Sequence, residues 1–261
     1  PSIHTVFGTA FHEVLQHYLD VMYDKSGAEA DRINIKELLE DKLREEYLIQ
    51  YKKNKNQHFS SSEEIREFFE DGIKILDYFK KNKSKYFSKK GWFLVGCEVP
   101  ISITPNNAYK NVIYNGFLDV VMYHEPTDTF QIIDIKTSTK GWNSYAKKDE
   151  EKQFQLILYK KFFAEQFGLA EESIDIEFLI VRRKVYDGGE YPQKRIQTFS
   201  PASGRNKLNK ATKILNEFIN EAFDYNGYKE TFHIPQPSKW NCHFCAFKEN
   251  DELCNVLGKN S

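Results

Sequence analysis

The sequence predicts an α/β fold in which a mixed central sheet is flanked by helices. Three observations predict it. The N-terminal third has the hydrophobic period of helices, the period changes to that of strands from residue 92, and helical and strand segments then alternate. A helix, three strands, a helix and a further strand favour one sheet packed between helices over separate helical and β domains. We therefore expect a single domain over residues 1–261.

The first part of the chain is predicted to be helical. Apolar and aromatic side chains recur at helical spacing in three segments, residues 8–24, 33–53 and 61–87. Ser61 or Ser62 can cap the third helix, because a serine oxygen accepts hydrogen bonds from first-turn N–H groups, and acidic residues follow at once. The other charges are typical of solvated helix faces. We predict that residues 30–90 form a helical insertion.

Strands are predicted from residue 92 onward. β-branched and aromatic residues dominate three consecutive segments, residues 92–104, 112–124 and 129–137. The sequence EPTD at 125–128 is typical of a turn, so the last two segments form a hairpin. Helical spacing returns and stops at Gly168, since glycine commonly ends helices. The remaining predicted elements are a helix over 151–168, a strand over 174–185 and a helix over 203–223.

Composition excludes several classes of protein. With 40% hydrophobic and 29% charged residues, and no apolar run near the roughly 18 residues of a membrane span, the sequence predicts a soluble protein without membrane contact. A net charge of −1 excludes a uniformly basic surface, so a polyanion would need a local patch. No signal peptide is recognisable. We expect a cytoplasmic or other intracellular protein of prokaryotic or phage origin, with an organellar protein as the alternative.

Two acidic residues and a lysine are predicted to meet at one edge of the sheet. Asp134 and Lys136 lie two positions apart in a strand, so their side chains share a face. The hairpin at 125–128 brings Asp119 close to Asp134. Two carboxylates suit Mg²⁺ or Mn²⁺, and Lys136 would orient or help to deprotonate an attacking water. The alternative is a surface salt bridge between Asp134 and Lys136, worth about 0–1 kcal/mol.

Asp119 followed by Asp134, Ile135 and Lys136 resembles the signature of PD-(D/E)xK nucleases. The core of that family has the same order of helix, three strands, helix and strand. Within it, the sequence is similar to the RecB-like branch, which includes bacterial recombination nucleases, CRISPR-associated RecB-like nucleases and mitochondrial genome maintenance exonucleases. The resemblance spans residues 8–184 and includes the cysteine-bearing tail.

Two further motifs carry this resemblance. Gly8 to His12 matches a GxxxH motif on the first helix of the branch, and Gln155 to Tyr159 matches a QxxxY motif whose two side chains lie on one helical face. The resemblance implies that the catalytic residues are Asp119, Asp134, Lys136, Gln155 and Tyr159. It also implies that the metal ligands are His12, Asp119, Asp134 and the carbonyl of Ile135.

Glu98 and a group of cations complete the candidate site. Glu98 stands on the first predicted strand, where related nucleases often place another acid, and it is either metal-linked or structural. Phosphate groups need cations, and clustered basic residues follow the predicted site. The candidate DNA-binding residues are Lys140, Arg182, Arg183 and Lys184.

A cysteine-containing tail is predicted over residues 232–261, packing back on the core. Cys242, Cys245 and Cys254 have a spacing that suits Zn²⁺ or an iron–sulfur cluster. The family resemblance implies a [4Fe-4S] cluster completed by an N-terminal cysteine, which would lie before Pro1 in a missing or trimmed N-terminus. The alternatives are a Zn²⁺ site completed by His233 or His243, and free buried thiols.

The sequence therefore predicts an Mg²⁺- or Mn²⁺-dependent deoxyribonuclease. The resemblance implies an exonuclease that hydrolyses phosphodiester bonds in single-stranded DNA or at DNA ends, in recombination, repair or replication, with a helicase or recombination protein as a possible partner. One alternative is a structure-specific or restriction-type endonuclease, because the same catalytic core serves both. Another is a non-cleaving DNA-binding subunit with the same fold.

Overall fold

The structure is a computed structural model. It describes residues 1–105, 111–186, 188, 193–224, 226–229, 237–243, 245–250, 252 and 254. The chain divides into two compact units: Pro1–Pro105 with Ile113–Lys213, and Asn106–Val112 with Ile214–Ser261. The first unit contains the sheet and every predicted catalytic residue. The predicted cysteine tail lies in the second unit, and its packing against the core stays a prediction.

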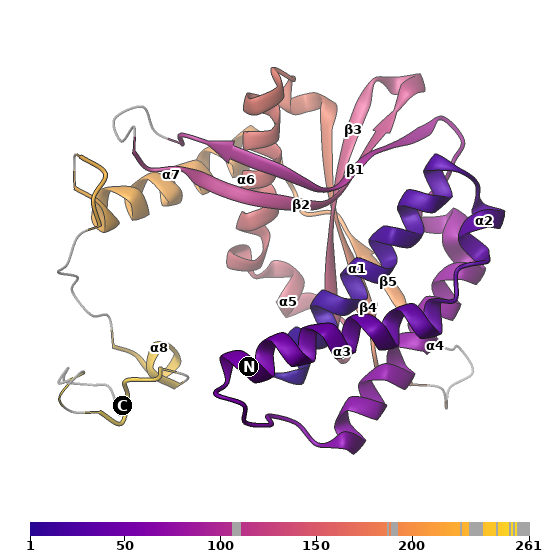
Figure 1. Ribbon diagram of the computed structural model, residues 1–261. Helices are drawn as coiled ribbons and strands as arrows, with labels where there is room; N and C mark the ends of the chain where they lie inside the picture. The colour runs from indigo at the N-terminus through magenta and orange to yellow at the C-terminus, as the bar shows by residue number, and fades with distance from the viewer. Residues whose placement is uncertain are drawn as a thin grey trace. The chain divides into compact units, whose positions relative to one another are not determined.

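A five-stranded mixed sheet forms the centre of the first unit, with strand order β1-β2-β3-β4-β5. Its strands are β1 (Trp92–Ile103), β2 (Tyr114–His124), β3 (Thr129–Ser138), β4 (Ile174–Arg182) and β5 (Ile196–Phe199). Only β3 and β4 pair in parallel, and the other neighbours are antiparallel. A parallel pair needs a crossover, which here contains the helix α6 (Figure 1).

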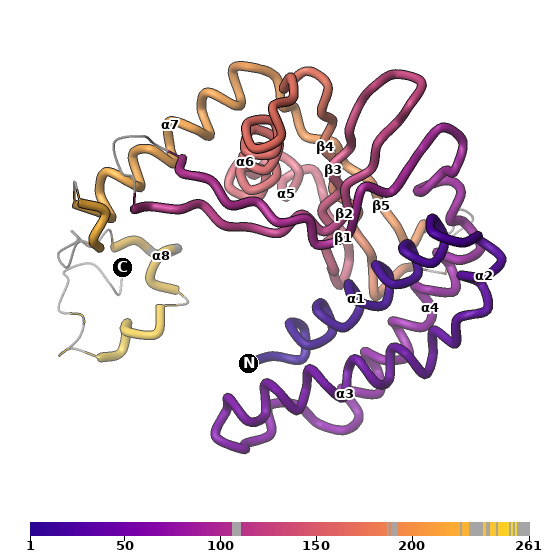
Figure 2. The backbone as a smooth tube through the Cα atoms, turned by 45° about the horizontal axis from the view of Figure 1, so that its top comes forward, coloured from indigo at the N-terminus to yellow at the C-terminus, as the bar shows by residue number. Residues whose placement is uncertain are grey.

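Helices lie on both sides of the sheet (Figures 1 and 2). One side carries α1 (Ile3–Asp24), α2 (Gly27–Asp31), α3 (Ile35–Lys53) and α4 (Ser62–Tyr86), and the other carries α5 (Ser144–Lys148) and α6 (Glu150–Phe167). Two short 3₁₀ helices, Glu125–Thr127 and Glu171–Ser173, and two further helices, α7 (Arg205–Ala222) and α8 (Lys239–His243), complete the described elements. The mixed sheet between helices confirms the predicted fold class.

The predicted helical insertion shares the main hydrophobic core. Apolar side chains of α1, α3 and α4 form one buried cluster with the sheet residues Val120, Met122, Ile133 and Ile135. Because α3 and α4 contribute fully buried residues such as Leu39 and Ile75, they stabilise the position of α1 on the sheet. Among the residues with assigned placement, no helix is both long and apolar enough to cross a bilayer.

Local capping explains where the helix boundaries differ from those predicted. The helix predicted from residue 8 begins at Ile3, because the Ser2 side chain accepts a hydrogen bond from Thr5 N–H. The segment predicted from residue 33 begins at Ile35, after a separate short helix, and the side chain of Asn34 caps it. The Ser61 cap of α4 and the end of α6 at Gly168, which has a φ of 66°, are as predicted. The strand predicted over 174–185 ends three residues earlier, at Arg182.

A buried ion pair fastens α4 to the end of β4. The Arg183 side chain is 6% exposed. Its Nη1 lies 3.1 Å from Asp71 Oδ2, and its guanidinium lies 3.5 Å from the centre of the Phe68 ring. Lys184 extends the pair, with Nζ 3.0 Å from Asp71 Oδ2 and 2.6 Å from Glu67 Oε1. Arg183 and Asp71 are therefore the two buried members of a charge network that Lys184 and Glu67 complete.

Asp71→Ala is expected to destabilise the protein by roughly 3–5 kcal/mol, because it removes the close partner of the buried Arg183 and leaves the 4.0 Å contact with Glu67. The free energy of unfolding in urea measures this loss. Glu67→Ala is the control, since that carboxylate is half exposed and an exposed ion pair contributes about 0–1 kcal/mol. Equal effects of the two substitutions would contradict the assignment of the buried pair.

Candidate active site

The sheet forks where the candidate site lies. Pairing between β2 and β3 runs from His124 and Thr129 to Val120 and Ile133 and then stops. The next opposite positions are Asp119 and Asp134. Beyond them, β2 continues beside β1 while β3 continues beside β4, so the two strands diverge (Figure 1). Asp119 and Asp134 therefore lie directly beyond the last paired residues, where the two strands separate.

The Asp119 carboxylate bridges the fork. Its Oδ2 accepts a 2.6 Å hydrogen bond from Ile135 N–H on β3. A side chain therefore connects the two strands directly beyond the last paired residues. Burial raises the pKa of Asp119 to about 6, an effect that the Ile135 N–H and Lys136 partly offset. The charged carboxylate is thus costly here unless a cation approaches.

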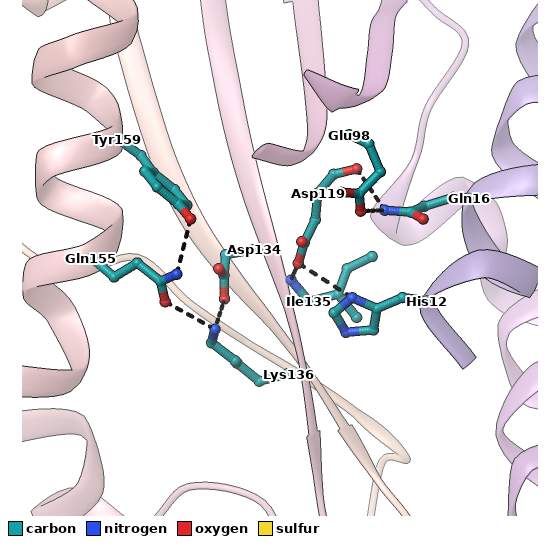
Figure 3. Close-up of polar contacts among 9 residues, drawn as sticks. All are labelled: His12, Gln16, Glu98, Asp119, Asp134, Ile135, Lys136, Gln155 and Tyr159. Carbon is teal, nitrogen blue, oxygen red and sulfur yellow. Dashed lines mark hydrogen bonds and ion pairs between the residues drawn. The ribbon is translucent and has the colours of Figure 1, made fainter. Parts of the chain in front are cut away.

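Asp134 and Lys136 lie on one face of β3, as predicted. Asp134 is 4% exposed, and its Oδ2 forms an ion pair with Lys136 Nζ at 2.8 Å (Figure 3). No atom of the described residues hydrogen-bonds to this oxygen in good geometry. Burial raises the pKa of Asp134 to about 6, the Lys136 charge opposes the rise, and the nearby Asp119 adds to it. The ion pair thus joins a buried Asp134 carboxylate to a Lys136 side chain that is 33% exposed.

The helix α1 brings His12 to the same fork. His12 Nδ1 lies 3.7 Å from Asp119 Oδ2 (Figure 3). Burial lowers the pKa of the imidazole, and Lys136 lowers it further, whereas Asp134 and Glu98 raise it. The neutral form is therefore favoured, and its ring nitrogen can serve as a ligand. The structure brings together His12, Asp119 and Asp134, as the resemblance implies.

Two side chains of α6, Gln155 and Tyr159, are hydrogen-bonded in series to Lys136. Gln155 Oε1 lies 3.3 Å from Lys136 Nζ and accepts its hydrogen bond, and Gln155 Nε2 donates to Tyr159 Oη at 2.9 Å (Figure 3). Tyr159 is 7% exposed and packs on β2, where a Cβ added at Gly116 would lie 2.9 Å from Tyr159 Cε1. Gly116 therefore permits the close approach of α6 to the fork.

Two features of the site were not predicted from the sequence. Glu98 has a φ of 50°, a left-handed conformation that non-glycine residues seldom adopt. Its Oε1 accepts a 2.6 Å hydrogen bond from Nε2 of Gln16, a residue that sequence reasoning missed. The available signal was its spacing, because Gln16 follows His12 by four positions and so lies on the same face of α1.

The carboxylates are not arranged as a closed metal site. As the side chains of the described residues are placed, they form no group of three or more His, Cys, Asp or Glu that could hold a metal ion. The reason lies in the contacts above, since Oδ2 of Asp119 is directed to Ile135 N–H and Oδ2 of Asp134 to Lys136. Ion binding would require these carboxylates to share their contacts with the cation.

The four candidate DNA-binding cations have different surroundings. Lys140 is exposed, and Arg182 is partly buried. Arg183 and Lys184 are paired with carboxylates of α4. The charges of these last two residues are largely compensated within the protein. Their role in DNA binding stays a prediction.

The cysteine predictions gain no support from the described residues. Within that part of the chain, Cys242, Cys245 and Cys254 form no disulfide. Cys245 N–H donates a 3.3 Å hydrogen bond to the Cys242 carbonyl, so these two residues share one turn. His243 is exposed, and His233 lies outside the described residues. The iron–sulfur cluster and the Zn²⁺ site stay predictions.

Comparison with known proteins identifies the family. A model of the "PD-(D/E)XK nuclease superfamily" matches residues 1–250. No curated protein sequence matches the chain. Among solved structures, the chain is similar to a crystal structure described as "Putative exonuclease" from Eubacterium rectale, with 13% sequence identity and a TM-score of 0.39. That match covers 87% of this chain and 77% of the other, and the likeness is too remote to carry an argument.

Gly116→Ala is expected to lower the turnover number at least about tenfold, because the added methyl group would displace Tyr159 and, through Gln155, disturb the position of Lys136. Single-turnover cleavage of a labelled oligonucleotide measures the effect. Gly204→Ala is the matched control, since nothing lies within 4 Å of a Cβ at that position. Equal turnover of the two variants would remove Tyr159 and Gln155 from the catalytic arrangement.

Asp134→Asn is expected to stabilise the metal-free protein above pH 6 by an amount on the order of 1–3 kcal/mol. The folded-state pKa of Asp134 is about 6 against 3.8 ordinarily, so protonation favours the folded state. The wild type should therefore lose stability as pH rises from about 4 to 6, and the variant should lose less. Thermal unfolding in EDTA between pH 4 and 8 measures the difference, with the exposed Asp41→Asn as control. A variant less stable than wild type at pH 8 would contradict this account.

Proposed function

The chain belongs to the PD-(D/E)XK nuclease superfamily, and from this premise we propose that it is an Mg²⁺- or Mn²⁺-dependent deoxyribonuclease that acts on single-stranded DNA or on DNA ends. The observation that carries the proposal is the meeting of His12, Asp119, Asp134 and Lys136 at the fork of the sheet. These groups come from two strands and a helix that are distant in sequence. Their convergence supports catalysis more than a shared fold alone does.

The donors at the fork suit a hard divalent cation. Two carboxylates and a neutral imidazole are ligands that Mg²⁺ or Mn²⁺ accepts. Burial raises the pKa of Asp119 and of Asp134 to about 6, and a bound cation would favour the charged form of both carboxylates. The buried Asp134 Oδ2 has no hydrogen bond in good geometry from the described residues. The proposed ligands are His12, Asp119, Asp134 and the Ile135 carbonyl.

Glu98 is proposed to act near the cation and not as one of its ligands. Its Oε1 is hydrogen-bonded to Gln16 and not directed to His12 or Asp134. The proposed role of Glu98 is therefore electrostatic, since its charge raises the pKa of both His12 and Asp119. A nearby negative charge of this kind favours a bound cation.

Lys136 is the proposed partner of the attacking water. A bound Mg²⁺ or Mn²⁺ would lower the pKa of water and neutralise charge on the phosphate. The Lys136 ammonium is held between Asp134 Oδ2 and Gln155 Oε1, so its position is set from β3 and from α6. From there it would orient the water and stabilise negative charge that develops on the phosphoryl oxygens. Gln155 and Tyr159 act through Lys136 in this proposal.

An exposed aromatic residue on β2 supports unpaired bases as the proposed substrate. Phe117 is 58% exposed and lies two positions before Asp119 in the sequence of β2. Base stacking on an exposed aromatic ring is a common way to bind single strands. Tyr145, 82% exposed on α5, offers a second ring.

Several finer parts of the proposal rest on the resemblance. They are the exonuclease mode, a role in repair or recombination, and a helicase partner. The alternative of a structure-specific or restriction-type endonuclease uses the same catalytic groups. The presence of His12, Asp119, Asp134 and Lys136 together argues against a non-cleaving DNA-binding subunit, because buried charges that serve no reaction are costly.

Lys136→Ala is expected to lower single-turnover cleavage of a single-stranded oligonucleotide by roughly 10²–10⁴-fold, the usual range for the loss of a group that assists proton transfer. Binding of the same oligonucleotide, measured by fluorescence anisotropy in Ca²⁺, should change less than about threefold. Lys152→Ala is the control, because Lys152 is an exposed lysine of α6 that pairs only with Asp149 among the described residues. Turnover retained by Lys136→Ala would exclude this lysine from the mechanism.

Circular single-stranded DNA distinguishes the two nuclease modes. The proposed exonuclease should degrade a linear strand with Mg²⁺ or Mn²⁺ and leave the circular form of the same sequence intact. Gel analysis over the same time course measures both reactions. Cleavage of the circle at a comparable rate would establish the endonuclease alternative, and no cleavage of either form would contradict the proposed activity.

A further inference from the structure

Asp119 lacks ordinary strand pairing on both sides. The β1–β2 ladder pairs Val120 with Cys97 and Leu118 with Val99 but omits Asp119, and the β2–β3 ladder ends at Val120. A strand residue without ladder bonds is held less firmly than its neighbours, yet a proposed metal ligand needs a defined position. Other contacts must therefore hold the main chain at this point.

One side chain makes the contact that replaces the ladder. Gln16 Nε2 donates a 3.0 Å hydrogen bond to the main-chain carbonyl of Asp119 and a 2.6 Å hydrogen bond to Glu98 Oε1 (Figure 3). A primary amide has two N–H donors, so a single nitrogen can serve both acceptors. The Gln16 side chain thus connects α1 to β1 and β2 at the fork.

The surroundings of Gln16 indicate a specific role. The buried side chains of α1 are otherwise hydrophobic, and Gln16 is 6% exposed. A helix that needed only to pack on the sheet would carry an apolar residue at this position, since burying an amide is unfavourable unless it is hydrogen-bonded. The two hydrogen bonds of its amide nitrogen go to Glu98 and to the Asp119 carbonyl, both at the fork.

Glu98 on β1 is the side chain that accepts a hydrogen bond from this amide. Its φ of 50° is strained for a non-glycine residue. The position lies opposite Asp119 in the β1–β2 register, between the pairs formed by Cys97 and Val99. The left-handed backbone directs the carboxylate to Gln16 and so completes the connection.

We propose that Gln16 is a positioning residue of the active site: its amide, oriented by Glu98, holds the main chain of Asp119 so that the Asp119 carboxylate is presented to the divalent cation. The inference rests on the proposed function, because it assumes that Asp119 binds that cation. Gln16 itself touches neither the cation nor the substrate. It acts through Asp119, in the way that groups behind a metal ligand orient the ligand.

Direct Mn²⁺ binding tests this proposal without relying on turnover. Isothermal titration calorimetry and electron paramagnetic resonance of free Mn²⁺ give the dissociation constant of the full chain and its variants. Gln16→Met keeps the length of the side chain and removes both hydrogen bonds. We expect it to weaken Mn²⁺ binding by roughly 10–100-fold, the range typical of residues that orient metal ligands. Single-turnover cleavage at limiting Mn²⁺ should fall in parallel.

Gln166→Met is the matched control. Gln166 is a helix glutamine that also bonds to the main chain of β1, at Ser102 N–H and the Pro100 carbonyl, away from the fork. This variant should keep the wild-type dissociation constant for Mn²⁺. If Gln16→Met lowers the melting temperature but leaves Mn²⁺ binding unchanged, Gln16 is only a structural residue and the proposal is overturned.

Glu98→Gly keeps the proposal testable if Gln16→Met does not fold. Glycine adopts a positive φ without strain, so this variant should fold. It should weaken Mn²⁺ binding more than Glu98→Gln, which also removes the charge but keeps an oxygen acceptor for Gln16. Equal Mn²⁺ binding by Glu98→Gly and Glu98→Gln would overturn the proposed positioning through Gln16 and Glu98. A wild-type protein that binds no Mn²⁺ would instead contradict the proposed function, so the two failures can be told apart.

Discussion

The separation of β2 from β3 is the constraint on which the site depends. Up to Val120 and Ile133 the two strands share a ladder, and beyond it Asp119 and Asp134 occupy opposite positions in strands that no longer pair. In a continued ladder these two carboxylates would lie directly opposite each other and repel. The fork instead gives each carboxylate a separate partner, Ile135 N–H for one and Lys136 for the other. The proposed roles of Asp119 and Asp134 depend on this separation of β2 from β3.

Burying charged groups at the fork is energetically unfavourable, and Lys136 offsets this effect only in part. Two acids with pKa values of about 6 and an imidazole with a lowered pKa lie around one lysine. Hydrophobic residues of similar volume would often be at least as stable. The charges are therefore better explained by chemistry than by stability. The same principle separates this cluster from the pair of Arg183 and Asp71, whose charges compensate each other and join α4 to β4.

The order of helices and strands could be predicted because hydrophobic period depends on local sequence. Boundaries were less predictable, since they depend on caps such as Ser2 and Asn34, which are common polar residues elsewhere in the chain. The four-residue strand β5 was missed, because it is too short to show a period and exists through its pairing with β4. Arg183 illustrates a further limit, as a basic residue after a strand can face solvent or, as here, a buried carboxylate.

The sequence by itself determined the class of fold and the residue types at the candidate site, because Asp134 and Lys136 are close along one strand and a short hairpin connects Asp119 to them. Only the tertiary structure decided how these groups are held. The approach of α1 brings Gln16 and His12 to the fork, and the backbone of Glu98 turns left-handed at that point. Such contacts join residues more than 80 positions apart, and no local pattern encodes a distance of that kind. These contacts form only when α1 packs on the sheet.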